Sequence, residues 1–372
     1  MPDTTIKTPT ADPAARSEDA TGRLVSIWKE TLGVADVGIN QNYFDLGGDS
    51  ALAVQLFSRI EKAFHIKLPL ATLFEAPTIE ELARVVEQDM AESSWSSLVP
   101  IQPNGSRPPF FCIHGAGGNV LIYRELSQSL GPDQPFYGLQ AQGLDGKLPP
   151  LEKIEDMAAR YVKEIRRLKA HGPYLIGGYC MGGTIAFEMA QQLRAEGEEV
   201  SLLALFDTTD WSKIRIPTAL DKLYFFIERF GFHVANYLRL DVAGRKEFFS
   251  EKLQSFRNRV PVWRGMLLST FGGRNGSGIP ESRLLGEIWR LNDRACIEYK
   301  PKPYPGSVAD FRPIQQYRIF DKPGAKWDRL AEKGQLVIVL PVYPAGMLLQ
   351  PFVKHLASAL RQAIDDAVGR RQ

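Results

Sequence analysis

A chain of 372 residues is too long for one ordinary domain, so we expect two or three domains. Apolar residues make up 44% of it and charged residues 24%, which excludes a largely disordered chain and fits a soluble globular protein. The formal net charge of +2 argues against a nucleic-acid-binding protein.

The sequence shows no pattern typical of a membrane segment, a disulfide framework or a metal site. Residues 1–17 lack the apolar core of a signal peptide, and no apolar run is long enough to span a bilayer. The three cysteines, Cys112, Cys180 and Cys296, have no paired spacing that suggests disulfides or zinc. We therefore expect a cytoplasmic protein without a metal and without a membrane partner.

The first part of the chain is predicted to be a small helical bundle. Residues 1–17, rich in Pro, Thr, Asp and Ala, are typical of a disordered lead, and the helical spacing of apolar residues begins after them, over 18–91. Thr78 and Glu81 have the spacing of a capping box. The Ser/Pro/Gly-rich residues 92–107 are predicted to be a linker. The inward-facing positions of the bundle are Leu24, Ile27, Trp28 and Leu32, then Leu52, Leu56 and Ile60, then Leu82, Val86 and Met90.

Residues 108–372 are predicted to form an α/β domain. Fully apolar runs alternate with helical patterns, which indicates a mostly parallel sheet covered on both faces. Aromatic-rich helical segments interrupt this rhythm over about 211–300, and we interpret them as an inserted lid. Predicted strands are 109–115, 136–139, 174–179, 200–207, 317–321 and 335–340; predicted helices are 123–130, 154–169, 183–196, one around Trp327 and one from Gln350.

A serine-bearing motif precedes the second helical pattern. The string from Tyr43 to Ser50 reads YFDLGGDS, and Ser50 taken alone is a helix N-cap after a glycine turn. The whole string resembles the attachment motif of peptidyl and acyl carrier domains, and the resemblance covers about residues 18–91. It implies a four-helix bundle with 4′-phosphopantetheine attached to Ser50 by a phosphopantetheinyl transferase. A phosphate there would meet the free backbone N–H groups of a helix start.

A second motif lies between an apolar run and a helical pattern. Residues 178–182 read GYCMG, which has the form G-x-nucleophile-x-G of a nucleophile elbow. Small residues on both sides permit such a strained, crowded turn. Cys180 occupies the nucleophile position, where serine is usual. A buried cysteine in a tight turn is the alternative interpretation.

Two further segments complete the candidate site. Asp207 ends an apolar run and is expected to be the acid of a triad, unless it is only a strand end. Residues 114–118, HGAGG, resemble the oxyanion loop of α/β-hydrolases. The backbone N–H groups of Ala116 and Met181 are expected to face the thioester oxygen, whereas His114 is expected to be structural rather than a base.

From residue 98 to its end, the chain resembles the terminal thioesterase domains of nonribosomal peptide synthetases. The segments that carry the resemblance are PPFFCIHGAGG, the elbow, LFDT, YKPKPYPG and residues 348–356. It implies an α/β-hydrolase fold, upstream adenylation or condensation domains, and an acyl or aminoacyl thioester as substrate. A carrier directly upstream agrees with this interpretation.

The family's histidine is missing from its expected loop, where Pro344 stands instead. The usual Ser-His-Asp set therefore becomes Cys-Pro-Asp. His233, in the predicted lid, could reach inward. A cysteine at a helix start is expected to have a lowered pKa and to be partly thiolate without a base. The remaining histidines are His65, His114, His171 and His355.

Without a histidine, hydrolysis is expected to be slow, because a missing general base costs about 10²–10⁴-fold. We therefore expect release by cyclisation or by Claisen- or Dieckmann-type condensation, with Asp207, its pKa raised by burial, as the base. Such condensation would resemble the quinone- and furanone-forming synthetases. The alternatives are a simple hydrolytic thioesterase and a catalytically degenerate hydrolase-fold partner that only binds the carrier. An engineered Ser-to-Cys change would explain Cys180 but not Pro344.

Overall fold

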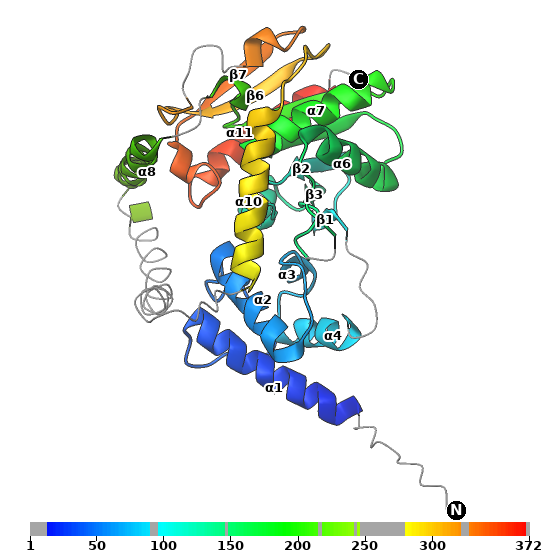
Figure 1. Cartoon of the computed structure of the whole chain (residues 1–372), viewed down its shortest axis with the longest axis vertical. Helices are drawn as coiled ribbons and strands as arrows, with labels where there is room; N and C mark the ends of the chain where they lie inside the picture. Colours follow the sequence, from blue (N-terminus) through cyan, green and yellow to red (C-terminus); the bar gives the residue numbers. More distant parts are fainter. Residues whose placement is uncertain are drawn as a thin grey trace, which may run out of the picture. The chain divides into compact units, whose positions relative to one another are not determined.

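The computed structural model describes residues 13–89, 96–145, 148–214, 218–241, 244–245, 280–320 and 327–369 (Figure 1). The described residues fall into two compact units, 13–89 and 96–369. None of the helices within these ranges has the length and apolarity that crossing a membrane requires.

The first unit consists of four helices, as predicted: α1 (Pro13–Leu32), α2 (Ser50–Phe64), α3 (Thr72–Glu75) and α4 (Ile79–Asp89). Because α1 already begins at Pro13, the prediction of a disordered lead over 1–17 is wrong for its last five residues. Proline suits a first helical turn, where its missing N–H has no intrahelical partner. Residues 1–12 lie outside the described part.

The predicted apolar faces form the core of this unit. Trp28 is fully buried and meets the Tyr43 ring edge-on, with 5.5 Å between the ring centroids. The capping box is confirmed: the Glu81 N–H donates to Thr78 Oγ1 at 3.2 Å, and the Thr78 N–H donates to Glu81 Oε2 at 3.1 Å. Leu24, Leu32, Leu52, Leu56, Ile60, Leu82 and Val86 are buried as predicted, Ile27 is half-buried, and the side chain of Met90 lies outside the described residues.

The second unit is built on a seven-stranded sheet of order β1-β3-β2-β4-β5-β6-β7. β1 is antiparallel to β3, and every other neighbouring pair is parallel. The mostly parallel sheet of the prediction is therefore confirmed. The strands are β1 (Leu98–Gln102), β2 (Phe110–Ile113), β3 (Phe136–Leu139), β4 (Tyr174–Tyr179), β5 (Val200–Phe206), β6 (Val308–Pro313) and β7 (Gln335–Leu340).

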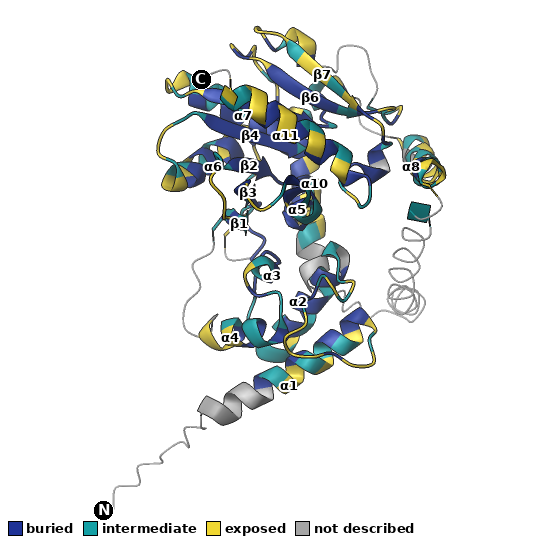
Figure 2. Ribbon diagram, turned by 180° about the vertical axis from the view of Figure 1, so that it is seen from behind, coloured by how far each residue is buried: buried dark blue, intermediate teal, exposed yellow. Residues whose placement is uncertain are grey.

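Helices cover both faces of the sheet (Figure 1). α6 (Ile154–Leu168) and α7 (Met181–Ala195) pack together on one face, and α7 contacts β2, β4 and β5. α5 (Arg124–Leu130) and α11 (Val353–Gly369) pack together on the other. Figure 2 shows the strands buried between these layers. Short 3₁₀ turns, η1 (Leu121–Tyr123), η3 (Trp327–Arg329) and η4 (Pro344–Gly346), lie in the connections.

Two predicted boundaries are wrong. β1 lies inside the segment 92–107 predicted as a linker, and it pairs with β3. Residues 317–320, predicted as part of a strand, form none, and the strand in this part of the chain is β6. The prediction missed β6 because Asp310 interrupts its apolar run. Asp310 is fully buried and accepts hydrogen bonds at 2.6 Å from Arg312 Nε and from Gln335 Nε2.

Two long helices, α8 (Ala219–Arg239) and α10 (Pro280–Glu298), interrupt the strand–helix alternation between β5 and β6 after the 3₁₀ turn η2 (Trp211–Lys213). Phe225 and Phe232 of α8 pack on Tyr317, with ring centroids 4.5 and 5.1 Å away. Phe226 and Phe230 are exposed. The predicted lid residue Trp263 lies outside the described residues.

Candidate active site

Ser50 is the first residue of α2 and is half-buried. Asp49, rather than Ser50, caps this helix, because Asp49 Oδ1 accepts a hydrogen bond of 2.8 Å from the Leu52 N–H. The interpretation of Ser50 as an N-cap is therefore wrong. Its hydroxyl is not needed for capping, and it stands where the first N–H groups of a helix favour a phosphate.

The two glycines before the serine have distinct roles. Gly47 has φ +84°, a conformation that favours glycine. A Cβ on Gly48 would lie 2.4 Å from the buried ring of Tyr43, whose hydroxyl donates to the Asp49 carbonyl oxygen at 3.0 Å. Tyr43 and Gly48 thus hold the cap residue directly before Ser50.

Cys180 lies in a strained turn between β4 and α7. Its backbone has φ +55° and ψ −118°, a region that residues with a side chain rarely adopt. The Cys180 N–H donates to the Phe206 carbonyl oxygen at 2.9 Å, which joins the turn to the end of β5. This is the geometry expected of a nucleophile elbow.

The surrounding backbone explains the glycines of the elbow. A Cβ on Gly178 would lie 2.4 Å from the Gly182 carbonyl carbon, and a Cβ on Gly182 would lie 2.2 Å from the Ile113 carbonyl oxygen. A Cβ on Gly183 would meet Thr208 Oγ1 at 2.1 Å. The elbow therefore packs directly against the end of β2 and the segment after β5, with no room for side chains.

The expectation of a partly ionised cysteine is wrong. Burial, and then the negative charge of Asp207, raise the pKa of Cys180 to about 12. The backbone N–H of Met181 donates to the sulfur and lowers its pKa, but it does not outweigh these two effects. The resting site therefore holds a neutral thiol, which has to lose its proton to a base when it reacts.

Asp207 directly follows β5 and has φ +45°. Its N–H donates to the Phe311 carbonyl oxygen at 2.9 Å, and Gln316 Nε2 donates to its Oδ1 at 3.2 Å. Its charge acts on the Cys180 sulfur. Burial above all, and to a lesser extent the charge of Asp207, raise the pKa of Tyr317 to about 12. Cys180 and Asp207 thus both lie at the carboxyl edge of the sheet, and the charge of Asp207 acts on the sulfur.

The loop after β2 approaches the elbow from the other side, because Gly182 packs against the carbonyl groups of Ile113 and His114. Ala116 lies in this loop, and its carbonyl oxygen accepts a 2.9 Å hydrogen bond from Asn292 Nδ2 of α10. Met181 begins α7 and is buried. The backbones of the two predicted oxyanion donors therefore belong to segments in direct contact.

The pKa of Cys180 is set by burial, by the charges of Asp207 and Asp293 and by the Met181 N–H, and none of these groups is a histidine. His114 is fully buried between the Tyr161 hydroxyl and the Gly115 carbonyl oxygen, both at 2.7 Å, and burial lowers its pKa to about 4. A neutral imidazole that donates from Nδ1 to Gly115 and accepts at Nε2 from Tyr161 satisfies both contacts. His114 is therefore structural. His171 pairs with Glu198 at 3.0 Å, His233 lies in α8, His355 lies in α11, and His65 follows α2.

Pro344 is buried in η4, in the loop after β7. Asn236 of α8 holds this loop by two hydrogen bonds with Tyr343: the Tyr343 N–H donates to Asn236 Oδ1 at 2.9 Å, and Asn236 Nδ2 donates to the Tyr343 carbonyl oxygen at 3.4 Å. The Tyr343 ring stacks on Phe232, with 5.2 Å between centroids. The loop expected to carry a histidine is thus packed against α8.

Sequence reasoning missed Gln316, which holds Asp207, and Asn292, which holds the loop after β2. Neither residue belongs to a motif, and each lies more than 100 positions from its partner in the sequence. Gln316 follows β6, the strand that was not predicted, so no local signal pointed to it.

Together, the fold and this geometry define a carrier unit followed by an α/β-hydrolase domain with a nucleophile elbow. Family models agree: residues 22–86 match the phosphopantetheine attachment site, and residues 108–278 match the thioesterase domain. The chain thus joins a carrier domain to a thioesterase domain of the kind found in nonribosomal peptide synthetases.

A curated relative, the dimodular nonribosomal peptide synthase of Bacillus subtilis (strain 168), is 44% identical over 184 residues. That match covers 50% of this chain and only 8% of the relative. Among solved structures, the four-domain nonribosomal peptide synthetase AB3403 matches with a TM-score of 0.57 and 22% identity, over 97% of this chain and 27% of that one. The NocB thioesterase domain, in covalent complex with a fluorophosphonate nocardicin G analogue, matches with a TM-score of 0.51 and 22% identity, over 72% of this chain and 99% of that one. These structural matches establish the fold.

Proposed function

We propose that this chain is the releasing end of an acyl assembly line, in which an acyl group on a phosphopantetheine arm at Ser50 passes to Cys180 and then leaves by bond formation. The observation that carries the proposal is the elbow. It places a thiol beside the Met181 N–H and the charge of Asp207, and Pro344 stands where the family's histidine is expected. Upstream adenylation or condensation domains would supply the acyl group, and a phosphopantetheinyl transferase would attach the arm.

Transfer to the enzyme exchanges one thioester for another. The Cys180 thiol gives its proton to the Asp207 carboxylate while its sulfur attacks the acyl carbonyl carbon, and the N–H groups of Ala116 and Met181 hydrogen-bond to the resulting oxyanion. The bond from carbon to the pantetheine sulfur then breaks, and Asp207 returns the proton to that sulfur. Because a thioester is broken and another formed, the step is close to thermoneutral.

Release needs a nucleophile that Asp207 can deprotonate. An amine, hydroxyl or acidic C–H of the acyl chain, or of a second acyl unit on the Ser50 arm, loses its proton to Asp207 and attacks the Cys180 thioester. The Cys180 sulfur leaves and recovers the proton from Asp207. Water is a weak acid and nucleophile without an imidazole base, so cyclisation or carbon–carbon condensation is favoured over hydrolysis.

Replacing Cys180 by alanine or serine tests this proposal. Neither variant should form an acyl-enzyme, because alanine has no nucleophile and the serine hydroxyl, without an adjacent histidine, is not activated. Stopped reactions of wild type and both variants, with an acyl group loaded on the Ser50 arm, should show a covalent adduct at residue 180 only in wild type. Unchanged product release by Cys180→Ala would contradict the proposal.

The replacement of the expected histidine by Pro344 favours one second candidate, a hydrolase fold that only binds the loaded carrier. It predicts that the acyl group stays on Ser50 in wild type and in Cys180→Ala alike. The same adduct measurement therefore separates the two functions.

A further inference from the structure

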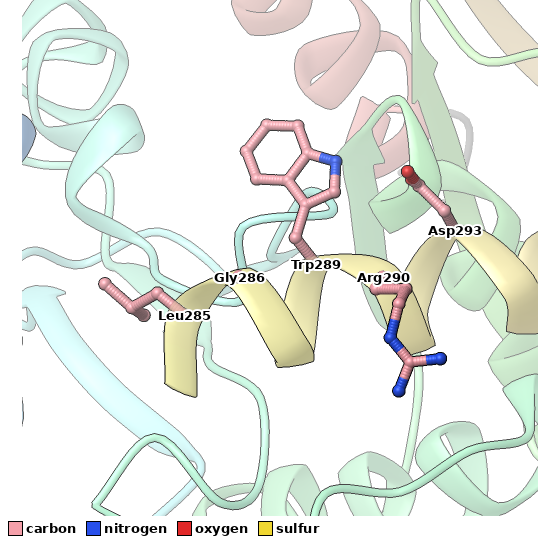
Figure 3. A pocket seen from close by; sticks show the side chains of 5 residues that line it. All are labelled: Leu285, Gly286, Trp289, Arg290 and Asp293. Atoms are coloured by element: carbon pink, nitrogen blue, oxygen red, sulfur yellow. The ribbon is translucent and has the colours of Figure 1, made fainter. Parts of the chain in front are cut away.

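A pocket of about 410 Å³ opens along α10 and is lined by Leu285, Gly286, Trp289, Arg290 and Asp293. This volume lies within the range of small-molecule sites. Figure 3 shows Trp289 and Asp293 projecting to the same side of the helix, as residues four apart do, whereas Arg290 points away from them. The pocket therefore combines an aromatic ring with a carboxylate.

Two contacts attach this part of α10 to the active site. Asn292 is buried and donates to the Ala116 carbonyl oxygen at 2.9 Å. Trp289 lies over Gly117, where an added Cβ would be 3.4 Å from Trp289 Cζ3. The pocket thus adjoins the loop proposed to bind the thioester oxygen.

The two charges that act on the Cys180 sulfur, those of Asp207 and Asp293, are both negative. Asp293 accepts a hydrogen bond from the Trp289 indole, and its charge, like that of Asp207, acts on the Cys180 sulfur and raises the pKa of the thiol. Among the described residues, Arg229 acts on Tyr179 and Tyr317 instead. Asp207 loses its charge when it accepts the thiol proton, whereas the Asp293 charge remains and opposes the oxyanion, so a cation beside Asp293 would stabilise the reaction.

We propose that the α10 pocket binds the ammonium group of an aminoacyl thioester, beside the Asp293 carboxylate and the Trp289 ring. A carboxylate beside an indole ring suits an ammonium ion, through charge-assisted hydrogen bonds and a cation–π contact. The pocket adjoins the oxyanion loop, as an amino group one carbon from the reacting carbonyl requires. This inference rests on the proposed function and narrows its substrate to acyl groups that carry an amine.

The bound ammonium also offsets the charge that holds Cys180 as a thiol. Substrate binding then favours ionisation of the nucleophile, and an acyl group without an amine leaves the thiol less reactive. Asp293 would act here as a specificity residue, through its contact with the substrate amine.

Binding of two matched amides tests the pocket without any catalytic turnover. Phenylalaninamide is cationic at pH 6.5, whereas 3-phenylpropanamide has nearly the same shape and is neutral. Calorimetric titration of the holo chain carrying Cys180→Ala should show at least about tenfold tighter binding of the cationic amide. Asp293→Asn should lose this preference, and Glu287→Gln, an exposed carboxylate on the same helix, should keep it.

Acyl transfer provides the second measurement. Wild type should move a phenylalanyl group from Ser50 to Cys180 faster than a 3-phenylpropionyl group, and Asp293→Asn should make the two rates equal. Without substrate, Cys180 of Asp293→Asn should be alkylated faster than Cys180 of wild type. Equal binding of the two amides, or a preference that Asp293→Asn retains, would overturn the inference. Failure of both acyl groups to reach Cys180 would refute the proposed function instead and leave the binding result to decide the pocket.

Discussion

Replacing Gly182 by alanine tests whether the elbow packs against β2 as the structure shows. The added Cβ would lie 2.2 Å from the Ile113 carbonyl oxygen and 2.7 Å from that of His114. Cβ atoms do not approach other atoms within 3.0 Å, so the elbow and β2 would have to separate by at least 0.8 Å, the difference between 3.0 and 2.2 Å. Both neighbours are backbone atoms, and no side chain can rotate away to make room.

Overpacking of this kind costs about 1–3 kcal/mol, and in a domain of this size each kcal/mol lowers Tm by about 2–4 °C. A displacement near 1 Å at the reacting atoms costs about 100-fold in rate. We therefore expect Gly182→Ala to lower Tm by about 2–12 °C in a thermal melt and to slow acyl transfer about 100-fold.

Gly231→Ala is the matched control, because nothing lies within 4 Å of its added Cβ in helix α8. Alanine favours a helix over glycine by about 0.5–1 kcal/mol, so this variant should be slightly more stable and equally active. If Gly182→Ala keeps wild-type stability and transfer, the close packing of elbow and β2 is refuted.

Three further predictions follow from the site. Asp207→Asn removes a charge that raises the pKa of Cys180, so iodoacetamide should alkylate this thiol faster at pH 8, about tenfold for each unit by which its pKa falls. Acyl transfer should slow about 10²-fold or more, because the base is missing. Slower alkylation would contradict the assigned cause. Burial lowers the pKa of His114 to about 4 on folding, so the unfolded chain binds more protons between about pH 6.5 and 4, and the free energy of unfolding should decrease by up to about 3 kcal/mol as the pH is lowered across that window. Urea unfolding of wild type and His114→Gln at several pH values checks this, and the same pH dependence in both would exclude His114 as its source. In a Cys180→Ser background, Pro344→His should raise hydrolysis by about 10²–10⁴-fold over Pro344→Ala, and no gain would mean that residue 344 does not face the nucleophile.

Most elements could be predicted from apolar periodicity alone. Phe136–Leu139 and Tyr174–Tyr179 agree residue for residue with β3 and β4, because buried parallel strands are continuous apolar runs. β6 could not be predicted this way. Its Asp310 is buried at the strand centre and satisfied by Arg312 and Gln335, and such pairing is visible only in three dimensions.

The chemistry of the site was harder to predict than its location. The elbow motif placed Cys180 correctly, because the form G-x-nucleophile-x-G describes local backbone geometry. The pKa of its thiol was predicted in the wrong direction. A helix N-terminus lowers a cysteine pKa, but burial and the charge of Asp207, which is 27 positions away in the sequence, outweigh it here. Asp293 of α10 adds to this effect, and no motif connects it with the elbow.

The most direct test of the central claim is a time-resolved map of where the acyl group resides. The full chain would be converted to its pantetheine form at Ser50, loaded with a phenylalanyl thioester, digested at intervals and analysed by mass spectrometry. The proposed function predicts that the acyl group leaves the Ser50 peptide, appears on the Cys180 peptide, and persists there until an amine or carbon nucleophile is supplied. An acyl group that remains on Ser50, or that is lost to water with no adduct on Cys180, would contradict it.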